Sequence, residues 1–332
     1  MIKVGINGFG RIGRLVFRRL FENPDIEVVG INDITDNKTL AHLLKYDSIH
    51  KKYWHKVSFE GENSITVNNK SIRTFAIKNP EEIPWKEVGA EIILECSGLF
   101  TSREKAELHL KAGAKKVIIS APAKGNDITI VIGVNENEYD KEKHHIISNA
   151  SCTTNAWVPM VKVLHDNFKI IRGTMTTTHS YTNDQRILDL PHKDLYRTRA
   201  ACLSLIPTTT GAASQVSKIF PELEGKLSGV AIRVPTPDAS LVDFTCIVEK
   251  STTVDEIKKI FKEASETFLK NILEYNEEPI VSTDVIGNPH SCVFNADLIQ
   301  VIDGTLIKVM AWYDNEWGYS CRLAELTEIV GK

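Results

Sequence analysis

The chain has 332 residues, of which 42% are hydrophobic and 25% are charged. This length is typical of about two domains, and the composition excludes a disordered, collagen-like or coiled-coil protein. Forty basic and forty-three acidic residues give a net charge of −3, which argues against a protein that binds nucleic acid or an anionic membrane by bulk charge.

The N-terminus and the cysteines favour a cytoplasmic protein. Residues 1–5 do not combine a basic leader with a long apolar stretch, so we expect no secretory signal. No run approaches the roughly eighteen apolar residues of a membrane span. The six cysteines include no C-x-x-C pair, which indicates reduced thiols rather than a disulfide framework.

The first 150 residues alternate between strand-like and helical patterns. The expected strands are residues 2–7, 26–31, 91–96, 117–120, 128–132 and 146–148, and the expected helices are residues 11–21, 39–46 and 102–112. Residues 57–77 alternate like antiparallel hairpins. Because strands and helices alternate, the sequence predicts an N-terminal domain over residues 1–150 with a Rossmann-type, doubly wound parallel sheet in an α/β fold.

After residue 150 the pattern changes to long strands. One helix is expected over 152–168, and stretches rich in Thr, Val and Ile follow at 170–181, 226–234, 239–249 and 304–313. They predict an α+β catalytic domain over residues 151–316 with a largely antiparallel sheet. Residues 182–210 show few regular signals, and a long irregular segment in a compact domain is usually functional or interfacial. Residues 318–330 predict a final helix.

A glycine motif near the N-terminus predicts a dinucleotide site. Gly8, Gly10 and Gly13 form a G-x-G-x-x-G between an expected strand and an expected helix. These glycines permit a tight turn and let the backbone approach a pyrophosphate at the helix N-terminus. Asp33 ends the second strand, where a carboxylate accepts hydrogen bonds from a ribose and repels a 2′-phosphate. The pattern favours NAD over NADP; the alternative is a glycine turn with a surface aspartate.

Cys152 stands where an expected strand meets an expected helix. The helix dipole and the N–H groups of the first turn favour a thiolate there and can hold an oxyanion. The alternative is a small buried cysteine, which is our interpretation of Cys96, Cys202, Cys246 and Cys292. His179 ends a Thr-rich strand and is the best candidate base, although spacing alone does not select it among ten histidines. Since no further ligand pair accompanies these two residues, no metal is expected.

Several further segments match one family. They read INGFGRIGR at the start, SNASCTTN around Cys152, HSYTNDQ from His179, PHKDL from Pro191, IPTTTGAA from Ile206, RVPTP from Arg233 and WYDNEWGYS from Trp312. On these segments the sequence resembles the phosphorylating, NAD-dependent glyceraldehyde-3-phosphate dehydrogenases of glycolysis along its whole length. The resemblance implies that Cys152 attacks the aldehyde and passes through a thiohemiacetal and a thioester, with His179 as general base. Inorganic phosphate then releases 1,3-bisphosphoglycerate.

The resemblance also implies binding residues. For the substrate phosphate it implies Thr182 and Arg233; for the attacking phosphate it implies Ser151, Thr153, Thr210 and Gly211; and Arg197 lies near both. For NAD it adds Arg11, Ile12, Lys78 and Ser120 on the pyrophosphate and adenosine side, and Asn315 and Tyr319 beside the nicotinamide. An arginine fork and neutral hydroxyl or N–H donors suit phosphate oxygens.

The resemblance further implies a homotetramer in which residues 182–204 form an S-shaped loop against a neighbouring subunit's cofactor site. It also implies that a C-terminal helix, about residues 317–332, packs on the first domain. The expected partners are glyceraldehyde 3-phosphate and inorganic phosphate, without nucleic acid or membrane. Three positions depart from the family pattern: Ala156 replaces a common second cysteine, Tyr196 a common basic residue, and Asp238 a common asparagine.

Other functions remain open on the sequence. Erythrose-4-phosphate dehydrogenase shares the fold, the cysteine and the histidine. A semialdehyde dehydrogenase of the aspartate type also joins these features but lacks the SCTTN, RVPTP and DNEWG set. A cysteine hydrolase or acyltransferase would leave Asp33 and Asn315 without a role. A non-catalytic NAD-binding protein would have no need of both Cys152 and His179.

Overall fold

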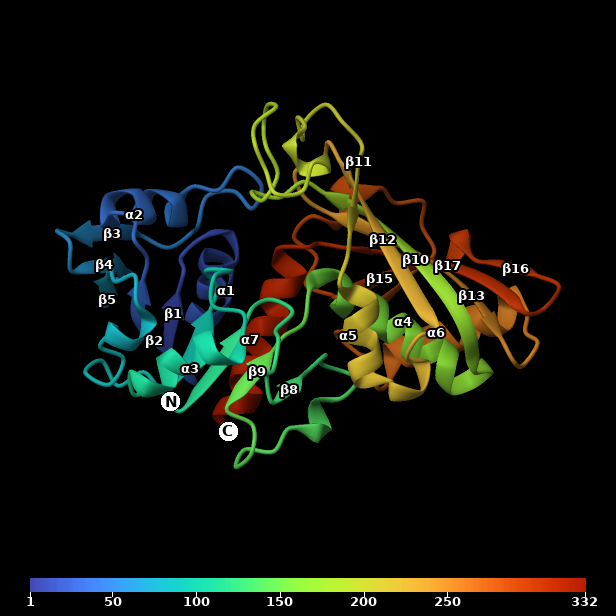
Figure 1. The fold of residues 1–332 in the computed structure, drawn as a ribbon, viewed down its shortest axis with the longest axis horizontal. Coiled ribbons are helices and arrows are strands. Elements are labelled where there is room, and N and C mark those ends of the chain that lie inside the picture. Colours follow the sequence, from blue (N-terminus) through green and yellow to red (C-terminus); the bar gives the residue numbers. More distant parts are fainter. The chain divides into compact units, whose positions relative to one another are not determined.

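The computed structural model describes all residues from 1 to 332, which divide into two units. Unit 1 comprises Met1–Ile130, Glu136–Ala150 and Ser320–Lys332, and unit 2 comprises Val131–Asn135 and Ser151–Tyr319. Figure 1 labels the elements of both units. None of the helices has both the length and the apolar character that crossing a membrane requires.

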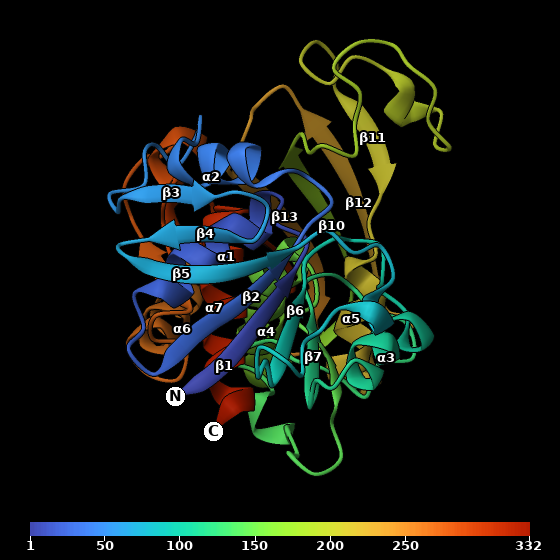
Figure 2. The ribbon, with the colours of Figure 1, turned by 90° about the vertical axis from the view of Figure 1, so that its left-hand side faces the viewer.

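Unit 1 is built on a nine-stranded sheet in the order β3-β4-β5-β2-β1-β6-β7-β9-β8. Figure 2 labels the part of this order from β3 to β7. The strands are β1 (Ile2–Asn7), β2 (Ile26–Asn32), β3 (Val57–Glu60), β4 (Ser64–Val67), β5 (Lys70–Phe75), β6 (Ile92–Glu95), β7 (Lys116–Ile119), β8 (Ile128–Thr129) and β9 (Ile146–Ser148). Neighbouring strands from β5 through β8 are parallel, whereas β3, β4 and β5 are antiparallel. The strand order reverses at β1, between β2 and β6, and open α/β sheets bind ligands at such a switch point.

Buried apolar side chains fix the helices of unit 1 to this sheet. The helices are α1 (Arg11–Phe21), α2 (Asn37–Lys45), α3 (Arg103–Lys111) and the later part of α7 (Trp317–Gly331), with short η1 (Pro80–Glu82) and η2 (Glu136–Glu138). Leu15 and Phe17 of α1 are fully buried. The end of α7 lies close to β1, since a Cβ on Gly331 would come within 2.5 Å of the Ile2 side chain. A larger residue there would force the Ile2 side chain to shift.

Unit 2 is built on an eight-stranded sheet in the order β11-β12-β10-β13-β17-β15-β14, with β16 paired to β17. The strands are β10 (Ile170–Ser180), β11 (Ile206–Thr209), β12 (Leu227–Val234), β13 (Ser240–Val248), β14 (Leu273–Asn276), β15 (Cys292–Asn295), β16 (Gln300–Ile302) and β17 (Leu306–Tyr313). The pairs β10/β12 and β14/β15 are parallel and the others are antiparallel. The α/β fold with a parallel and a largely antiparallel sheet is therefore confirmed.

Helices cover one face of the unit 2 sheet (Figure 1). They are α4 (Cys152–Phe168), α5 (Ala212–Ile219) and α6 (Val254–Glu266), with short η3 (Tyr196–Thr198), η4 (Pro221–Leu223), η5 (Ser282–Val285) and η6 (Ala296–Leu298). Trp157 of α4 meets Phe244 of β13 edge-on at 5.3 Å between ring centroids. Residues of β13 and β17 alternate between buried and half-buried, so the second face of this sheet is only partly covered.

The sequence missed two helices of unit 2. α6 carries a capping box, in which the Thr253 hydroxyl accepts from the Glu256 N–H and the Glu256 carboxylate accepts from the Thr253 N–H. Its buried side chains Ile257, Phe261 and Ala264 recur at helical spacing. Both signals are readable from the sequence. α5 has only eight residues and no side-chain cap, which leaves little local signal.

Candidate active site

A cavity of about 450 Å³ lies in unit 1 at the carboxyl ends of β1, β2 and β6. It is lined by Asn7, Gly8, Gly10, Asn32, Asp33, Ile34, Ile77, Lys78, Cys96, Ser97, Leu99 and Phe100. Four of these, Gly8, Gly10, Asp33 and Lys78, are sequence-predicted cofactor residues. The sequence did not single out the others, although their places just after parallel strands are a signal of a ligand site.

The glycines of the motif have three different surroundings. Gly8 has φ +88°, and a Cβ there would lie 2.5 Å from the Ser97 backbone nitrogen. A Cβ on Gly13 would lie 2.1 Å from the Gly8 carbonyl oxygen. Gly10 is the N-cap of α1, and a Cβ there would meet nothing within 4 Å. The first and third glycines therefore permit the turn, while open space over Gly10 suits the close approach of a pyrophosphate, so the cavity fits NAD.

Asp33 is held in place by two backbone donors. Its Oδ2 accepts from the Phe9 N–H at 2.7 Å and its Oδ1 accepts from the Thr35 N–H at 2.9 Å. Each oxygen keeps further acceptor capacity. The carboxylate is thus oriented at the cavity and is suited to receive ribose hydroxyls.

Arg11, Ile12 and Ser120 do not line the cavity. The Arg11 guanidinium donates to both carboxylate oxygens of Asp47, at 2.8 and 3.2 Å. Although burial opposes ionisation, the His50 N–H and Arg11 lower the pKa of Asp47 to about 2. The Arg11 side chain is therefore directed toward Asp47. Ser120 hydrogen-bonds the thiol of Cys96, and Cys96 lines the cavity.

In unit 2, Cys152 is the first residue of α4. Ser151 is the N-cap, and its hydroxyl accepts from the Thr154 N–H at 3.0 Å. Ala150, two residues before the thiol, has φ +55°, a conformation that side-chain-bearing residues rarely adopt. The Cys152 Sγ lies 3.5 Å from the His179 Nε2. A nucleophile and a base thus lie within hydrogen-bonding reach of each other.

The sheet register places Arg233 beside His179. The two residues pair directly between the parallel strands β10 and β12. The Nδ1 of His179 lies 2.6 Å from the Arg233 Nη1 and 2.7 Å from the Ser180 carbonyl oxygen. A guanidinium only donates and a carbonyl only accepts, so a single Nδ1 cannot satisfy both. This contact therefore admits two tautomers of the imidazole.

The protonation states follow from burial and from Arg233. Burial and then the Arg233 charge lower the pKa of His179 to about 3, so its imidazole is neutral near pH 7. Burial raises the pKa of the Cys152 thiol, although Arg233 and the Thr153 N–H act in the opposite direction. The thiolate expected from the helix position is therefore not the favoured form here, because desolvation outweighs the donors of the helix end.

Tyr313, which the sequence did not single out, supports this pair. Its hydroxyl lies 2.9 Å from the hydroxyls of both Thr153 and Thr177. Its ring stands edge-on to the His179 imidazole at 6.0 Å. Burial raises the pKa of the Tyr313 hydroxyl, so it stays a neutral donor. The partners are far apart in the sequence, and no motif links them.

The other expected phosphate residues have partners within unit 2. Arg197 donates to the Thr208 hydroxyl at 2.9 and 3.0 Å and pairs with Asp184. The Arg197 charge also contributes to lowering the pKa values of His179 and Arg233, so it lies near both. The Thr182 N–H donates to the Gln185 side chain, and the Thr210 hydroxyl accepts from the Ala212 N–H. Gly211 is the N-cap of α5.

Asn315 and Tyr319, the expected nicotinamide residues, are buried in unit 2. The Asn315 Oδ1 accepts from the Ser240 hydroxyl at 2.7 Å. That hydroxyl in turn accepts from the Ser180 N–H at 3.1 Å. Because its oxygen is already held, the Asn315 side chain has a fixed orientation that leaves its NH₂ group to donate elsewhere.

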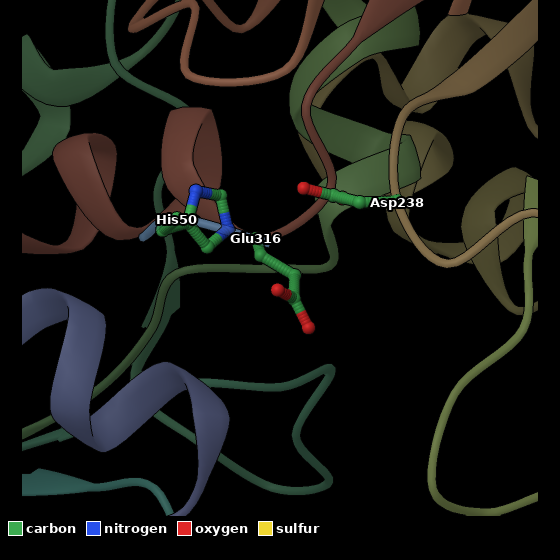
Figure 3. Close-up of side chains that lie close together, drawn as sticks. All are labelled: His50, Asp238 and Glu316. Carbon is green, nitrogen blue, oxygen red and sulfur yellow. The ribbon is translucent and has the colours of Figure 1, made fainter. Parts of the chain in front are cut away.

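Asp238 belongs to a group of acidic side chains in unit 2. A carboxylate oxygen of Asp238 lies within 4.8 Å of a carboxylate oxygen of Glu316, and Figure 3 labels both residues. His50, which is also labelled in Figure 3, belongs to unit 1. Asp314 accepts from the N–H groups of Glu316, Trp317 and Gly287 at 2.7–2.9 Å. Burial, Asp314 and Glu316 raise the pKa of Asp238 to about 9. Asp238 is therefore a neutral acid near pH 7.

Two family models match the chain. The "Glyceraldehyde 3-phosphate dehydrogenase, NAD binding domain" matches residues 2–103, and the "Glyceraldehyde 3-phosphate dehydrogenase, C-terminal domain" matches residues 151–315. Together with the dinucleotide cavity, they define an NAD-dependent oxidoreductase.

Relatives over the full length give the particular family. Proteins named glyceraldehyde-3-phosphate dehydrogenase are 60% identical in Thermotoga maritima, with 100% of both chains covered, and 58% identical in Geobacillus stearothermophilus, with 99% and 98% covered. "Glyceraldehyde-3-phosphate dehydrogenase 1" of Bacillus subtilis is 55% identical, with 100% and 98% covered. The chain belongs to the glyceraldehyde-3-phosphate dehydrogenase family.

Proposed function

We propose that this chain oxidises D-glyceraldehyde 3-phosphate with NAD and inorganic phosphate, giving 1,3-bisphosphoglycerate and NADH. The observation that carries the proposal is the contact of 3.5 Å between the Cys152 Sγ and the His179 Nε2, with Arg233 against the opposite nitrogen of the same imidazole. A nucleophile, a base and a phosphate-binding cation then meet around one ring. The names of the relatives favour the triose over erythrose 4-phosphate as substrate.

Arg233 couples substrate binding to the state of the base. When its guanidinium turns to the substrate phosphate, with Thr182 as a neutral donor, its charge no longer opposes protonation of His179. The Nδ1 proton of His179 then donates to the Ser180 carbonyl, which already lies 2.7 Å away. That tautomer leaves the Nε2 lone pair facing Cys152. His179 is thereby set to take the thiol proton.

Cys152 attacks the aldehyde carbon and forms a thiohemiacetal. The N–H groups at the start of α4 stabilise the oxygen that becomes negative, since a helix N-terminus favours an anion. His179 returns the thiol proton to that oxygen, and takes it back as the C–H hydrogen leaves as hydride and the carbonyl re-forms. The acyl group then remains on Sγ as a thioester.

NAD, when bound, supplies the hydride acceptor for this oxidation. We assign its adenosine and pyrophosphate part to Gly8, Gly10, Asp33 and Lys78 of the cavity. Arg11, Ile12, Gly13 and Ser120 support that part. We assign the nicotinamide carboxamide to the Asn315 NH₂ group, with Tyr319 beside the ring. Residues 1–150 with the C-terminal helix are then the NAD-binding domain, and residues 151–316 are the catalytic domain.

Inorganic phosphate releases the product from the thioester. Ser151, Thr153, Thr210 and Gly211 offer hydroxyl and backbone donors for it, and Arg197 supplies a positive charge nearby. In this structure the Ser151 hydroxyl caps α4 and the Thr153 hydroxyl contacts Tyr313. Both hydroxyls have a second lone pair or a rotatable proton, so these contacts are compatible with a bound anion.

We propose that the protein is a homo-oligomer, and a tetramer by its family resemblance. Large apolar side chains between residues 187 and 205 are exposed, namely Ile187, Leu188, Leu190, Leu195, Leu203 and Leu205. An apolar surface of this extent is typical of an interface. Sedimentation of the wild type and of Leu195→Asp tests the proposal. We expect the wild type to sediment as an oligomer and the variant to dissociate, because a charge is placed in the apolar interface.

The protein's six cysteines are free thiols, which supports a cytoplasmic location. The direct test of the function is NADH formation from glyceraldehyde 3-phosphate and NAD, with and without inorganic phosphate, beside erythrose 4-phosphate. We expect activity that requires phosphate and prefers the triose. Activity independent of phosphate, or a preference for erythrose 4-phosphate, would overturn the assignment.

A further inference from the structure

A chain of buried side-chain hydrogen bonds crosses unit 1 beneath the dinucleotide cavity. It runs from Trp85 through His109, Glu95 and Asn7 to Asn32, and all five side chains are at most 3% exposed. The successive contacts are 3.0, 3.0, 2.6 and 2.7 Å. None of these residues belongs to the glycine motif or to the thiol site.

Trp85 sets the donor-to-acceptor direction at one end of this series of hydrogen bonds. An indole N–H only donates, so the His109 Nδ1 must accept from it and the His109 Nε2 must carry the proton. Nε2 therefore donates to Glu95. The indole ring is fully buried and packs closely on Gly5 and Gly30, since a Cβ on them would come 2.7 and 3.2 Å from it.

Glu95 is the point on which the donors converge. One carboxylate oxygen accepts from His109 and from the Asn7 Nδ2 at 2.6 Å. The other accepts from the Ser97 N–H at 2.8 Å and from the Ser97 hydroxyl. Only a carboxylate, which has no donor, satisfies all four of these groups at once.

Glu95 fixes the orientation of two amides that border the cavity. Since the Asn7 NH₂ group must face Glu95, its oxygen faces the Asn32 Nδ2 at 2.7 Å. Asn32 then accepts from the Ile77 N–H at 3.0 Å and donates to the Ile77 carbonyl at 2.9 Å. The chain thus ties together the ends of β1, β2 and β6 and the segment that follows β5.

Each tied position adjoins a residue proposed for the cofactor. Asn7 precedes Gly8, Asn32 precedes Asp33, and Ile77 precedes Lys78 in the sequence. Asn7, Asn32 and Ile77 themselves line the cavity. A change in the donor-to-acceptor direction of these buried hydrogen bonds would therefore shift three walls of the cavity together.

We propose that Glu95 is a positioning residue for NAD: its carboxylate sets the polarity of the buried chain and so holds the walls of the cofactor cavity in register. The inference rests on the proposed use of this cavity for NAD. Glu95 acts through Asn7 and Asn32 and does not itself need to touch the cofactor. Second-layer residues of this kind change affinity by roughly 10- to 100-fold in metal sites, and we expect the lower end here.

Glu95→Gln is the primary test, with NAD binding followed by titration calorimetry on the whole protein. The glutamine has the same shape but only one acceptor oxygen, so at least one of the four donors faces its NH₂ group. We expect the Kd for NAD to rise about tenfold, with a similar loss for ADP-ribose. An unchanged Kd in the variant would overturn the proposal, whereas a wild-type protein that does not bind NAD would instead overturn the proposed function.

Val117→Ala is the matched control for general loss of stability. Val117 is fully buried in the apolar core of unit 1, in a cluster with Ala106, Ile119 and Ile146, and has no part in the chain. The Val117→Ala variant should have a lower melting temperature than the wild type but the same Kd for NAD. If it weakens NAD binding as much as Glu95→Gln at an equal loss of melting temperature, the role of Glu95 is only structural.

A second variant distinguishes polarity from simple damage. In the Glu95→Gln background, Trp85→Phe removes the donor that forces the tautomer of His109. The Nε2 of His109 is then free to accept from the new glutamine NH₂ group. We expect the double variant to bind NAD more tightly than Glu95→Gln alone, whereas weaker binding, as for two independent defects, would contradict control by polarity.

Discussion

The two units of this protein prepare their sites in opposite ways. In unit 1, every donor of the buried chain has an acceptor, and Glu95 alone receives four hydrogen bonds. In unit 2, the His179 Nδ1 faces a donor and an acceptor at once. The cofactor cavity is thus complete before any ligand binds, whereas the thiol site keeps two alternatives that a ligand must resolve.

This difference follows from what each site has to do. A site that only binds gains affinity when its groups are already ordered, because the ligand then does not have to order them. A site that transfers protons must pass between protonation states, so it cannot be locked in one of them. Single substitutions test this contrast, and the loss of the nucleophile has the largest expected effect.

Cys152→Ser should separate the two sites completely. A serine hydroxyl is far less nucleophilic than a thiol at neutral pH, so we expect kcat to fall by at least roughly 10⁴-fold. The affinity for NAD should stay at the wild-type value, because Cys152 neither lines the cofactor cavity nor is assigned a contact with NAD. Steady-state kinetics and calorimetry measure the two quantities on one preparation.

Cys246→Ser is the matched control, since Cys246 belongs to β13 and has no proposed catalytic, cofactor or interface role; Cys202, which the sequence led us to expect as buried, is exposed and lies in the proposed interface. The Cys246→Ser variant should keep full activity. If Cys152→Ser retains substantial turnover, or if both serine variants lose activity alike, the thiol chemistry proposed for α4 is wrong.

His179→Asn should reduce kcat by about 10²- to 10⁴-fold, the usual contribution of a general base. His165→Asn is its control, because His165 is another buried histidine of unit 2. The control should stay within a few-fold of the wild type. Equal losses in the two variants, measured as NADH formation, would show that His179 supports the fold rather than the reaction.

Arg233→Gln tests whether the substrate resolves the two tautomers. For glyceraldehyde 3-phosphate we expect kcat/KM to fall about 10²-fold, as the charged contact with the phosphate is lost. For glyceraldehyde, which has no phosphate, activity should stay constant or rise, because Nδ1 is then free to donate to Ser180. An equal loss with both aldehydes, in kinetics run side by side, would contradict this role of Arg233.

The sequence predicted the parts of both sites that lie in short motifs. Gly8, Gly10 and Asp33 line the cavity, and Cys152 begins α4 as the strand-to-helix junction indicated. For the glycines, Asp33 and Cys152, a local pattern and its position in a βα unit carry the information. His179 lies near the end of β10, but spacing alone does not select it among the ten histidines.

The residues that the sequence missed act over long separations. The Tyr313 hydroxyl reaches Thr153 and Thr177, and Glu95 reaches Asn7, from different strands. No local periodicity encodes such pairings, because sheet topology brings them together. The raised pKa of Cys152 is not predictable from the sequence for a related reason: the helix end is visible in the sequence, but the desolvation that opposes it is a property of the fold.

Asp238 gives the most direct test of pH dependence, on the stability of the fold rather than on activity. Its pKa rises from about 3.9 in an unfolded chain to about 9 in the fold, through burial, Asp314 and Glu316. Between these pH values the folded state binds a proton that the unfolded state does not. Stability therefore falls as the pH rises through this range, by at most about 1.4 kcal/mol per pH unit from this group.

Asp238→Asn should remove this slope, because an asparagine donates to Asp314 without titrating. The family resemblance leads one to expect asparagine at this position. The variant should gain stability relative to the wild type as the pH is raised from 6 to 9, and the gap should close toward pH 4. Urea denaturation at several pH values measures the free energy of unfolding of both proteins. Parallel pH profiles of the two proteins would show that Asp238 is ionised in the fold. The control is Glu249→Gln, which replaces an exposed carboxylate and should leave the pH profile of stability unchanged.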